Sequence, residues 1–384
     1  MHIDRTNLGE KLALCALVFY IATELLFRYS ALIISYPVIS TSNMLIWCEY
    51  AAMGMAIAAI ILRPRSISPY QAILAAATFA LLLFSSSRTL DYRLVHGLII
   101  LFAVSGIDLR KLCSAYYMTT MPIIAIVMLL AVIGLEHNVD VIPNSRLVFS
   151  YGFQHPNTTG CLLFSALGAM AYAHWESKTW IAPCLLSGVA GVFCYAFLSS
   201  HASAALLLAL AAITAFGHTK PGTKLAKIPH KPGFALLACV PLLLMGIALA
   251  CTAFFDSANP FMNWFNGIVH GRPLLAHNYY LGHDGFTLFG REYSPTVDYH
   301  SGLPFTSVDS GYSFLPLVTG IIPMLLLFAN YLAASWQLLK KPSNYFVVMI
   351  LLMQSFYFLV EFVPALLVLN FSVLFISEAY TLES

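Results

Sequence analysis

The sequence predicts an all-α membrane protein, a polytopic bundle of about twelve transmembrane helices with one long external loop between spans 9 and 10. Three observations predict this fold. First, 60% of the 384 residues are hydrophobic, only 9% are charged and the mean hydropathy is +0.81, whereas about 25% of a soluble domain is charged. Second, the apolar residues form runs of about 20, the length that a bilayer requires. Third, the only long polar segment, 255–311, lies between two such runs.

The expected spans follow the apolar runs in chain order, and shorter runs are included because a short helix can pack inside the protein. The first run is expected to be a retained span, since no small-residue cleavage site follows it. The spans are expected at 11–27, 44–62, 69–86, 94–107, 116–135, 158–175, 179–199, 202–217, 234–254, 311–335, 344–360 and 363–378.

The chain is expected to form a single membrane domain over residues 1–384. Its parts are spans 1–8 within 1–217, a basic cytoplasmic linker over 218–233, span 9 at 234–254, the external loop at 255–311 and spans 10–12 within 312–384. No internal repeat is evident.

The basic residues predict the orientation, because Lys and Arg accumulate in cytoplasmic loops. With both termini in the cytoplasm, 13 of the 19 basic residues fall inside, several of them in the linker 218–233. The external exceptions are Arg28, Arg88, Arg93, Arg146, Arg272 and Arg291. The long loop is therefore expected to be external.

Charge and cysteine usage exclude several classes of function. A net charge of +2 without a basic stripe argues against a nucleic-acid partner. All eight cysteines lie in or beside apolar segments, so neither a disulfide framework nor a zinc motif is expected. The four histidines of the long loop are irregularly spaced, and no metal or other cofactor is expected.

Other polar stretches join the long loop on the expected outer face. They are RLVFSYGFQHPNTTG at 146–160, SSHAS at 199–203 and the turn that carries Glu361. Pro156 breaks the chain before a helix and Asn157 occupies an N-cap position, which creates an anion-binding helix terminus. Alternatively, Asn157 is only a cap and His155 only an interfacial side chain. Glu24 and Glu49, near the outer ends of spans 1 and 2, are expected to face a cavity or a partner.

The segment GFQHPNTTG, residues 152–160, resembles the G-F-x-H-P-N-x-x-G segment of the bacterial Wzy-like polysaccharide polymerases, which are relatives of the O-antigen ligases. The similarity extends to the SSHAS corner, to LFGRE in the long loop and to VDSGYSFL before Gly320. His201 departs from the family, which has arginine at that corner, so a permanent positive charge is not expected there.

This resemblance implies a membrane glycosyltransferase of the bacterial cytoplasmic membrane. It would move a growing glycan from an undecaprenyl diphosphate carrier onto the next lipid-linked repeat unit, on the outer face and without a metal. The implied partners are the undecaprenyl-diphosphate-linked oligosaccharide, membrane lipid, a flippase and a chain-length regulator. Cations must meet the leaving diphosphate. Arg146 and Arg272 are expected to supply them, whereas Arg28 and Arg291 are expected to be solvated surface residues.

The acceptor hydroxyl requires a base. Asp309 is the first candidate and His155 the second, although an Asp at a helix start can instead be an N-cap. Asn157, His201 and Tyr312 are the further expected substrate contacts.

Within the loop, Phe261, Trp264, Phe265 and Ile268 recur at helical spacing. They predict an amphipathic helix at the membrane interface.

Three alternatives to a polymerase remain open. A ligase of the same superfamily would transfer a finished glycan, and family ligases tend to have His where this chain has Asp309. A lipid-linked sugar flippase would be expected to show repeats or midplane charges. A structural assembly protein would not need His, Asp and Arg brought together from separate loops.

Overall fold

The computed structural model describes residues 5–36, 43–64, 67–138, 140–141, 148–224, 227–294, 296–297, 304–305, 308–341, 344–362 and 365–381. The predicted all-α class is confirmed. The strands within these ranges are two short antiparallel pairs, β1 (Asp140–Val141) with β2 (Val148–Phe149) and β3 (Thr296–Val297) with β4 (Pro304–Phe305).

Helices make up most of the described chain. The first half contains α1 (Arg5–Glu24) continued by the π-helix η1 (Leu25–Tyr29), α2 (Leu32–Ser35), α4 (Met44–Leu62), α5 (Pro69–Thr89), α6 (Arg93–Val104), α7 (Leu109–Val132) and α8 (Pro156–His174). The second half contains η3 (Lys178–Trp180), α9 (Ile181–Ala196), α10 (His201–Gly217), α11 (Lys220–Lys224), α12 (His230–Phe254), α13 (Pro260–Ile268), α14 (Arg272–Gly282), α15 (Gly311–Phe314), η4 (Leu315–Thr319), α16 (Ile321–Leu338), α17 (Tyr345–Val360) and η6 (Phe371–Tyr380).

Within the described ranges, seven helices are long and apolar enough to cross a membrane. They are Arg5–Tyr29, Met44–Leu62, Pro69–Thr89, Leu109–Val132, Lys178–Ala196, His230–Phe254 and Ile321–Leu338. Each expected span overlaps a helix, but several of these helices are shorter or less apolar than a span requires. The chain is therefore a multi-span membrane protein, and the count of about twelve spans stays a prediction.

The expected tenth span, 311–335, is not one continuous helix. It consists of α15, a π-helical turn η4 and α16, and the break falls at Gly320, whose φ of 111° favours glycine. Backbone from the preceding loop satisfies the groups freed by the break, because Thr287 N–H donates to the Pro316 carbonyl at 3.0 Å and Arg291 N–H donates to the Val318 carbonyl at 2.9 Å. The LFGRE segment is thereby fixed against the broken helix.

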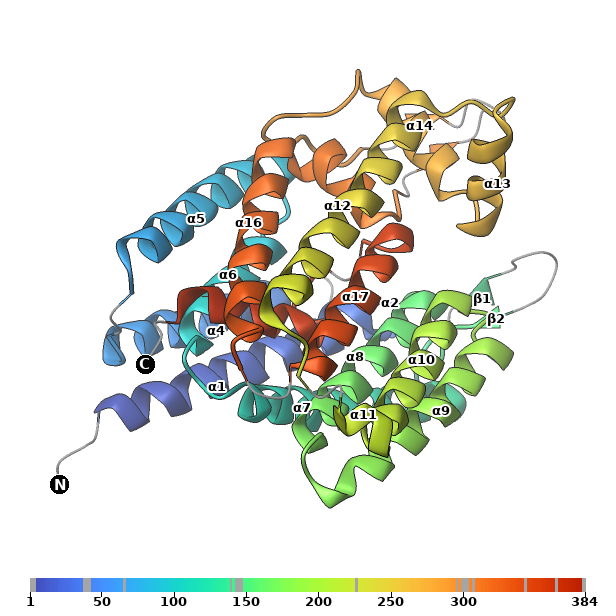
Figure 1. Ribbon diagram of the computed structural model, residues 1–384. Helices are drawn as coiled ribbons and strands as arrows, with labels where there is room; N and C mark the ends of the chain where they lie inside the picture. Colours follow the sequence, from blue (N-terminus) through green and yellow to red (C-terminus); the bar gives the residue numbers. More distant parts are fainter. Residues whose placement is uncertain are drawn as a thin grey trace.

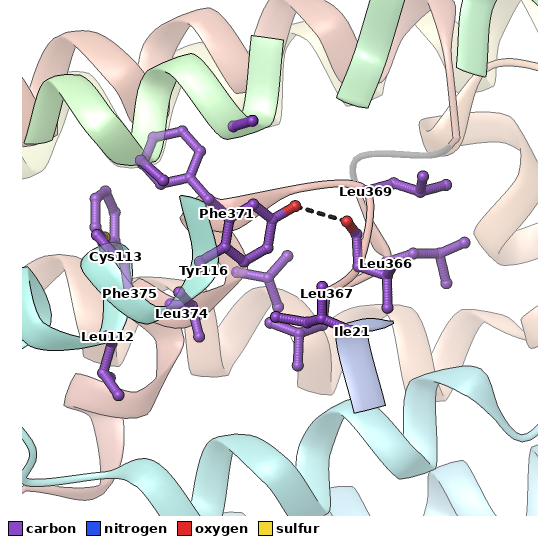
Figure 2. Packing of buried hydrophobic residues seen from close by; sticks show 14 of the residues in the cluster. Ile21, Leu112, Cys113, Tyr116, Leu366, Leu367, Leu369, Phe371, Leu374 and Phe375 are labelled. Carbon is purple, nitrogen blue, oxygen red and sulfur yellow. Dashed lines mark hydrogen bonds between the residues drawn. The ribbon is translucent and has the colours of Figure 1, made fainter. Parts of the chain in front are cut away.

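The expected twelfth span, 363–378, is also not a regular α-helix. After irregular backbone it forms the 3₁₀ helix η6, which is buried along nearly its whole length. Irregular backbone within a membrane protein is tolerated only where its polar groups find partners inside the protein. Here the Tyr116 hydroxyl donates to the Val368 carbonyl at 2.6 Å, and the Ser165 hydroxyl donates to the Leu369 carbonyl at 2.5 Å. Figure 2 shows this segment surrounded by buried side chains, including Ile21 of α1 and Leu112 of α7.

The packing brings the ends of several helices together at one end of the bundle. α8 lies in the interior and contacts α7, α9, α10, α17 and η6. α12 packs against α14 and α17, and α13 and α14 lie together beyond the end of α12 (Figure 1). We call this end, where α14, the start of α8 and the end of α17 meet, the loop face.

Candidate functional site

A cluster of polar side chains occupies the loop face, and Arg272 lies at its centre. Arg272 is the first residue of α14, and the chain reaches it through His270 and Gly271, whose φ values are 53° and 82°. Its Nε donates to the Val360 carbonyl at 2.7 Å, and its Nη2 donates to Glu361 Oε1 at 2.9 Å. The guanidinium therefore joins α14 to the end of α17.

Glu361 is a residue that the sequence placed on the outer face without a function. It follows the last residue of α17, and its Oε1 accepts a second hydrogen bond, from Asn157 Nδ2 at 2.8 Å. The carboxyl is almost fully buried, and this burial raises the pKa of Glu361 to about 7; Arg272 lowers the pKa and Asp309 raises it. The sequence did contain a sign of this role, because Glu361 is a single acid between two apolar runs. Such an acid indicates a functional residue or one with a buried partner.

The start of α8 differs from the expectation that Asn157 caps the helix. The N-cap residue is His155, whose Nδ1 accepts the Asn157 N–H at 3.1 Å, and Pro156 is the first helical residue. A ring nitrogen thus takes the capping role, and the Asn157 side chain is left to bond Glu361. Sequence reasoning placed the helix start too late because asparagine is the commoner cap.

His155 and Asp309 both lie within electrostatic reach of this cluster. Asp309 Oδ2 is 3.9 Å from Arg272 Nη2. Partial burial lowers the pKa of the His155 ring, Asp309 opposes this shift and Arg272 adds to it. The N-cap position of α15 is occupied by Ser310, whose side chain makes no capping hydrogen bond, so a capping role for Asp309 remains the alternative to the role of base.

His201 lies at the edge of the cluster, not at its centre. It begins α10, and its ring stacks on the ring of His270 with 6.0 Å between centroids. His270 comes two residues before Arg272, so His201 contacts the turn that positions the guanidinium. α10 lies close to α8 at this end, and the absence of a side chain at Gly160 permits this approach. A Cβ on Gly160 would lie only 2.7 Å from Ser203 Cβ.

One expected substrate contact, Tyr312, does not join the cluster. Tyr312 is buried below the loop face, where its ring meets Phe358 edge to face with 4.9 Å between centroids. It lines a mainly apolar cavity of about 170 Å³ between α12, α16 and α17. Arg146, the other expected diphosphate ligand, lies outside the described residues.

A second charged cluster lies between η1, α4 and α6. Arg28 was expected to be a solvated surface residue, but its guanidinium bonds Glu24 Oε2 at 2.9 Å and Glu49 Oε1 at 2.5 Å. Arg28 is therefore the partner that the two buried acids required. The Gln154 side chain donates to the Arg28 carbonyl at 2.6 Å and the Gln154 N–H donates to the Tyr29 carbonyl at 3.1 Å, which fixes the backbone just before His155.

Arg93 supports the other side of the site. It forms an ion pair with Asp91 at 2.6 Å, and its guanidinium carbon lies 5.8 Å from the ring centroid of Phe362, the neighbour of Glu361. Arg291, in contrast, bonds the carbonyls of His283 and Gly285 within its own loop. Both arginines therefore have structural partners.

The described part of the chain contains no group of three or more His, Cys, Asp or Glu side chains able to hold a metal ion. What the site offers is a guanidinium beside two carboxylates, an amide and an imidazole. These groups can bind an anion and accept a proton from a hydroxyl.

No protein-family model matches the chain, and neither a curated protein nor a solved structure is significantly similar to it.

Proposed function

We propose that this protein is a membrane glycosyltransferase that polymerises lipid-linked oligosaccharide repeat units into a cell-surface polysaccharide. The observation that carries the proposal is the meeting of Arg272, Glu361, Asn157, His155 and Asp309, which come from separate segments of the chain, at one end of an apolar helix bundle. A site at the end of such a bundle can reach a substrate whose lipid part stays in the membrane. The resemblance of GFQHPN to the Wzy-like polymerases supports the same reaction.

In the proposed reaction, the hydroxyl oxygen of the acceptor repeat unit attacks the anomeric carbon of the glycan on the carrier. The bond between this carbon and the diphosphate oxygen breaks, and undecaprenyl diphosphate leaves with the electron pair. Arg272 binds the leaving diphosphate, because a guanidinium can donate two hydrogen bonds to phosphate oxygens. Asp309 accepts the proton of the acceptor hydroxyl, with His155 as the alternative base.

The lipid part of the substrate favours an apolar surface next to the polar cluster. Tyr312 and Phe358 of α17 line the mainly apolar cavity described above, which is a candidate for this surface. On this proposal the loop face is the outer face of the bacterial cytoplasmic membrane, both termini are cytoplasmic, and a flippase and a chain-length regulator act with the enzyme.

The test is the lipid-linked glycan profile of cells that lack the protein. A polymerase predicts that single lipid-linked repeat units accumulate and that long chains disappear. Full-length chains that remain unattached to their acceptor would instead identify a ligase. Repeat units trapped on the inner leaflet would identify a flippase.

A further inference from the structure

The guanidinium that is proposed to bind diphosphate is already engaged by a carboxylate. Arg272 Nη2 bonds Glu361 Oε1 at 2.9 Å, and the exposed fractions of the two side chains are 13% and 9%. Asp309 Oδ2 lies 3.9 Å from the same nitrogen. A diphosphate that approaches Arg272 therefore meets two carboxylates as well as one guanidinium, and like charges at this distance oppose binding.

One of these carboxylates is suited to lose its charge. The Asp309 side chain is 34% exposed, whereas the Glu361 side chain is 9% exposed and is enclosed by the loop face. The groups that face Glu361 are Arg272 from α14, Asn157 and Cys161 from α8, Tyr357 from α17 and Asp309 from the segment before α15. Among these, Arg272 is the cation that favours the carboxylate form of Glu361.

Binding of a diphosphate would remove that support. The two negative charges of a diphosphate diester neutralise the positive charge of Arg272. Glu361 is then buried beside an anion, and this environment favours the protonated form of Glu361. Burial already raises the pKa of free Glu361 to about 7, so a further rise places proton uptake in the neutral range. A protonated Glu361 still accepts the Asn157 hydrogen bond through its carbonyl oxygen.

We propose that the Arg272 site binds a diphosphate diester together with one proton, and that Glu361 is the group that takes up this proton. The inference rests on the proposed function, because it assumes that Arg272 binds the diphosphate of the carrier. It makes Glu361 a positioning residue. As a carboxylate it holds Arg272 and Asn157 in place, and it gives up the ion pair when the substrate enters.

The experiment is calorimetric titration of the purified full-length protein in detergent with a farnesyl diphosphate sugar. This diester has no phosphate group that titrates near neutrality, so any proton taken up binds to the protein. Titration in two buffers with different ionisation enthalpies gives the number of protons bound. At about pH 8 we expect clear net uptake, with an upper limit of one proton per diester, and at about pH 5.5, where free Glu361 already carries its proton, uptake close to zero.

The matched variant is Glu361→Gln, which imitates the protonated carboxyl. Between about pH 7 and 8 the affinity of the wild-type protein should fall by up to about tenfold per pH unit, and the affinity of the variant should stay near the low-pH value of the wild type with no proton uptake. Uptake that persists in the variant would assign the proton to another group and overturn the inference. If the variant does not fold, the wild-type protein alone provides the test. Proton uptake that is the same at about pH 5.5 and about pH 8 would then overturn the inference.

The two proposals fail in different ways. A wild-type protein that binds the diester without proton uptake contradicts the role of Glu361 and leaves the anion site intact. A wild-type protein that binds no diester at any pH contradicts the anion site as well.

Discussion

At the scale of single residues, Arg272 makes the contacts that hold the loop face together. It bonds the Val360 carbonyl and Glu361, and it lies near Asp309. An arginine can make these bonds and meet a phosphate because its guanidinium carries several donors in one plane. Lysine has the charge but not this arrangement, so the two residues are not equivalent at this position.

Replacement of Arg272 should therefore reduce activity in a graded way. Arg272→Lys should slow polymer formation, and Arg272→Ala should slow it by roughly 10²–10³-fold, the usual cost of losing one group that stabilises the leaving charge. The measurement is polymer yield per amount of folded protein, with Arg291→Lys as the matched control, since the Arg291 side chain bonds the carbonyls of His283 and Gly285 in its own loop. Normal polymer formation by Arg272→Ala would rule out the diphosphate role.

Asp309 is tested by a substitution that keeps its shape. Asp309→Asn should leave membrane levels normal and lower the rate by roughly 10²–10⁴-fold, because an amide cannot accept the proton of the acceptor hydroxyl. Asparagine caps a helix about as well as aspartate, so a loss of rate at normal membrane levels separates the role of base from that of cap. The assay is the initial rate of polymer formation by purified protein without added metal. A rate close to wild type would show that Asp309 is not the base. His155 would then be the candidate, and His155→Gln would be the next variant to measure.

At the scale of secondary-structure elements, the hydropathy pattern predicted where helices occur but not how they end. The aromatic spacing of 261–268 predicted a helix that the structure contains as α13. The break at Gly320 was missed because Pro316 and Gly320 lie within an apolar run. Hydropathy averaged over a window shows that a run is apolar, but it does not show whether the helix is continuous. The 3₁₀ form of η6 was missed because it depends on distant donors, such as Tyr116 and Ser165.

The candidate site was predicted in part for the same reason. Local motifs pointed to His155, Asn157 and Arg272, which lie in one cluster. The pairing of Arg272 with Glu361 spans 89 positions of the chain, and no local pattern encodes it. The depth of Tyr312 likewise follows from the packing of α12 against α15 and α17, which a single sequence does not reveal.

The interior position of α8 gives a prediction about packing. A Cβ on Gly168 would lie 2.4 Å from the Phe371 ring, whereas a Cβ on Gly188 of α9 would meet no atom within 4 Å among the described residues. Gly168→Ala should therefore destabilise the protein by roughly 1–3 kcal/mol through overpacking. Gly188→Ala should be neutral or stabilising by up to about 1 kcal/mol, since alanine favours a helix. Thermal unfolding in detergent measures both, and equal effects would contradict the contact between α8 and η6.

At the scale of the whole molecule, the proposal requires the loop face to lie outside the cell. The exposed residues Ser257, before α13, and Thr223, in α11, report on the two sides. A cysteine at Ser257 should react with a membrane-impermeant thiol reagent in intact cells, and a cysteine at Thr223 should react only after lysis. The unsubstituted chain, whose eight cysteines lie in or beside apolar segments, is the background control. Reversed labelling would place the polar cluster in the cytoplasm and contradict the proposed substrate.

The most direct test of the proposed function is the reaction of the purified protein with lipid-linked repeat units alone. The protein is reconstituted in vesicles with a radiolabelled undecaprenyl-diphosphate-linked repeat unit, without metal ions or nucleotide sugars, and the products are separated by size. A polymerase predicts a ladder of chains that differ by one repeat unit, together with release of undecaprenyl diphosphate. Label that stays in single repeat units, with folded protein present, would contradict the assignment.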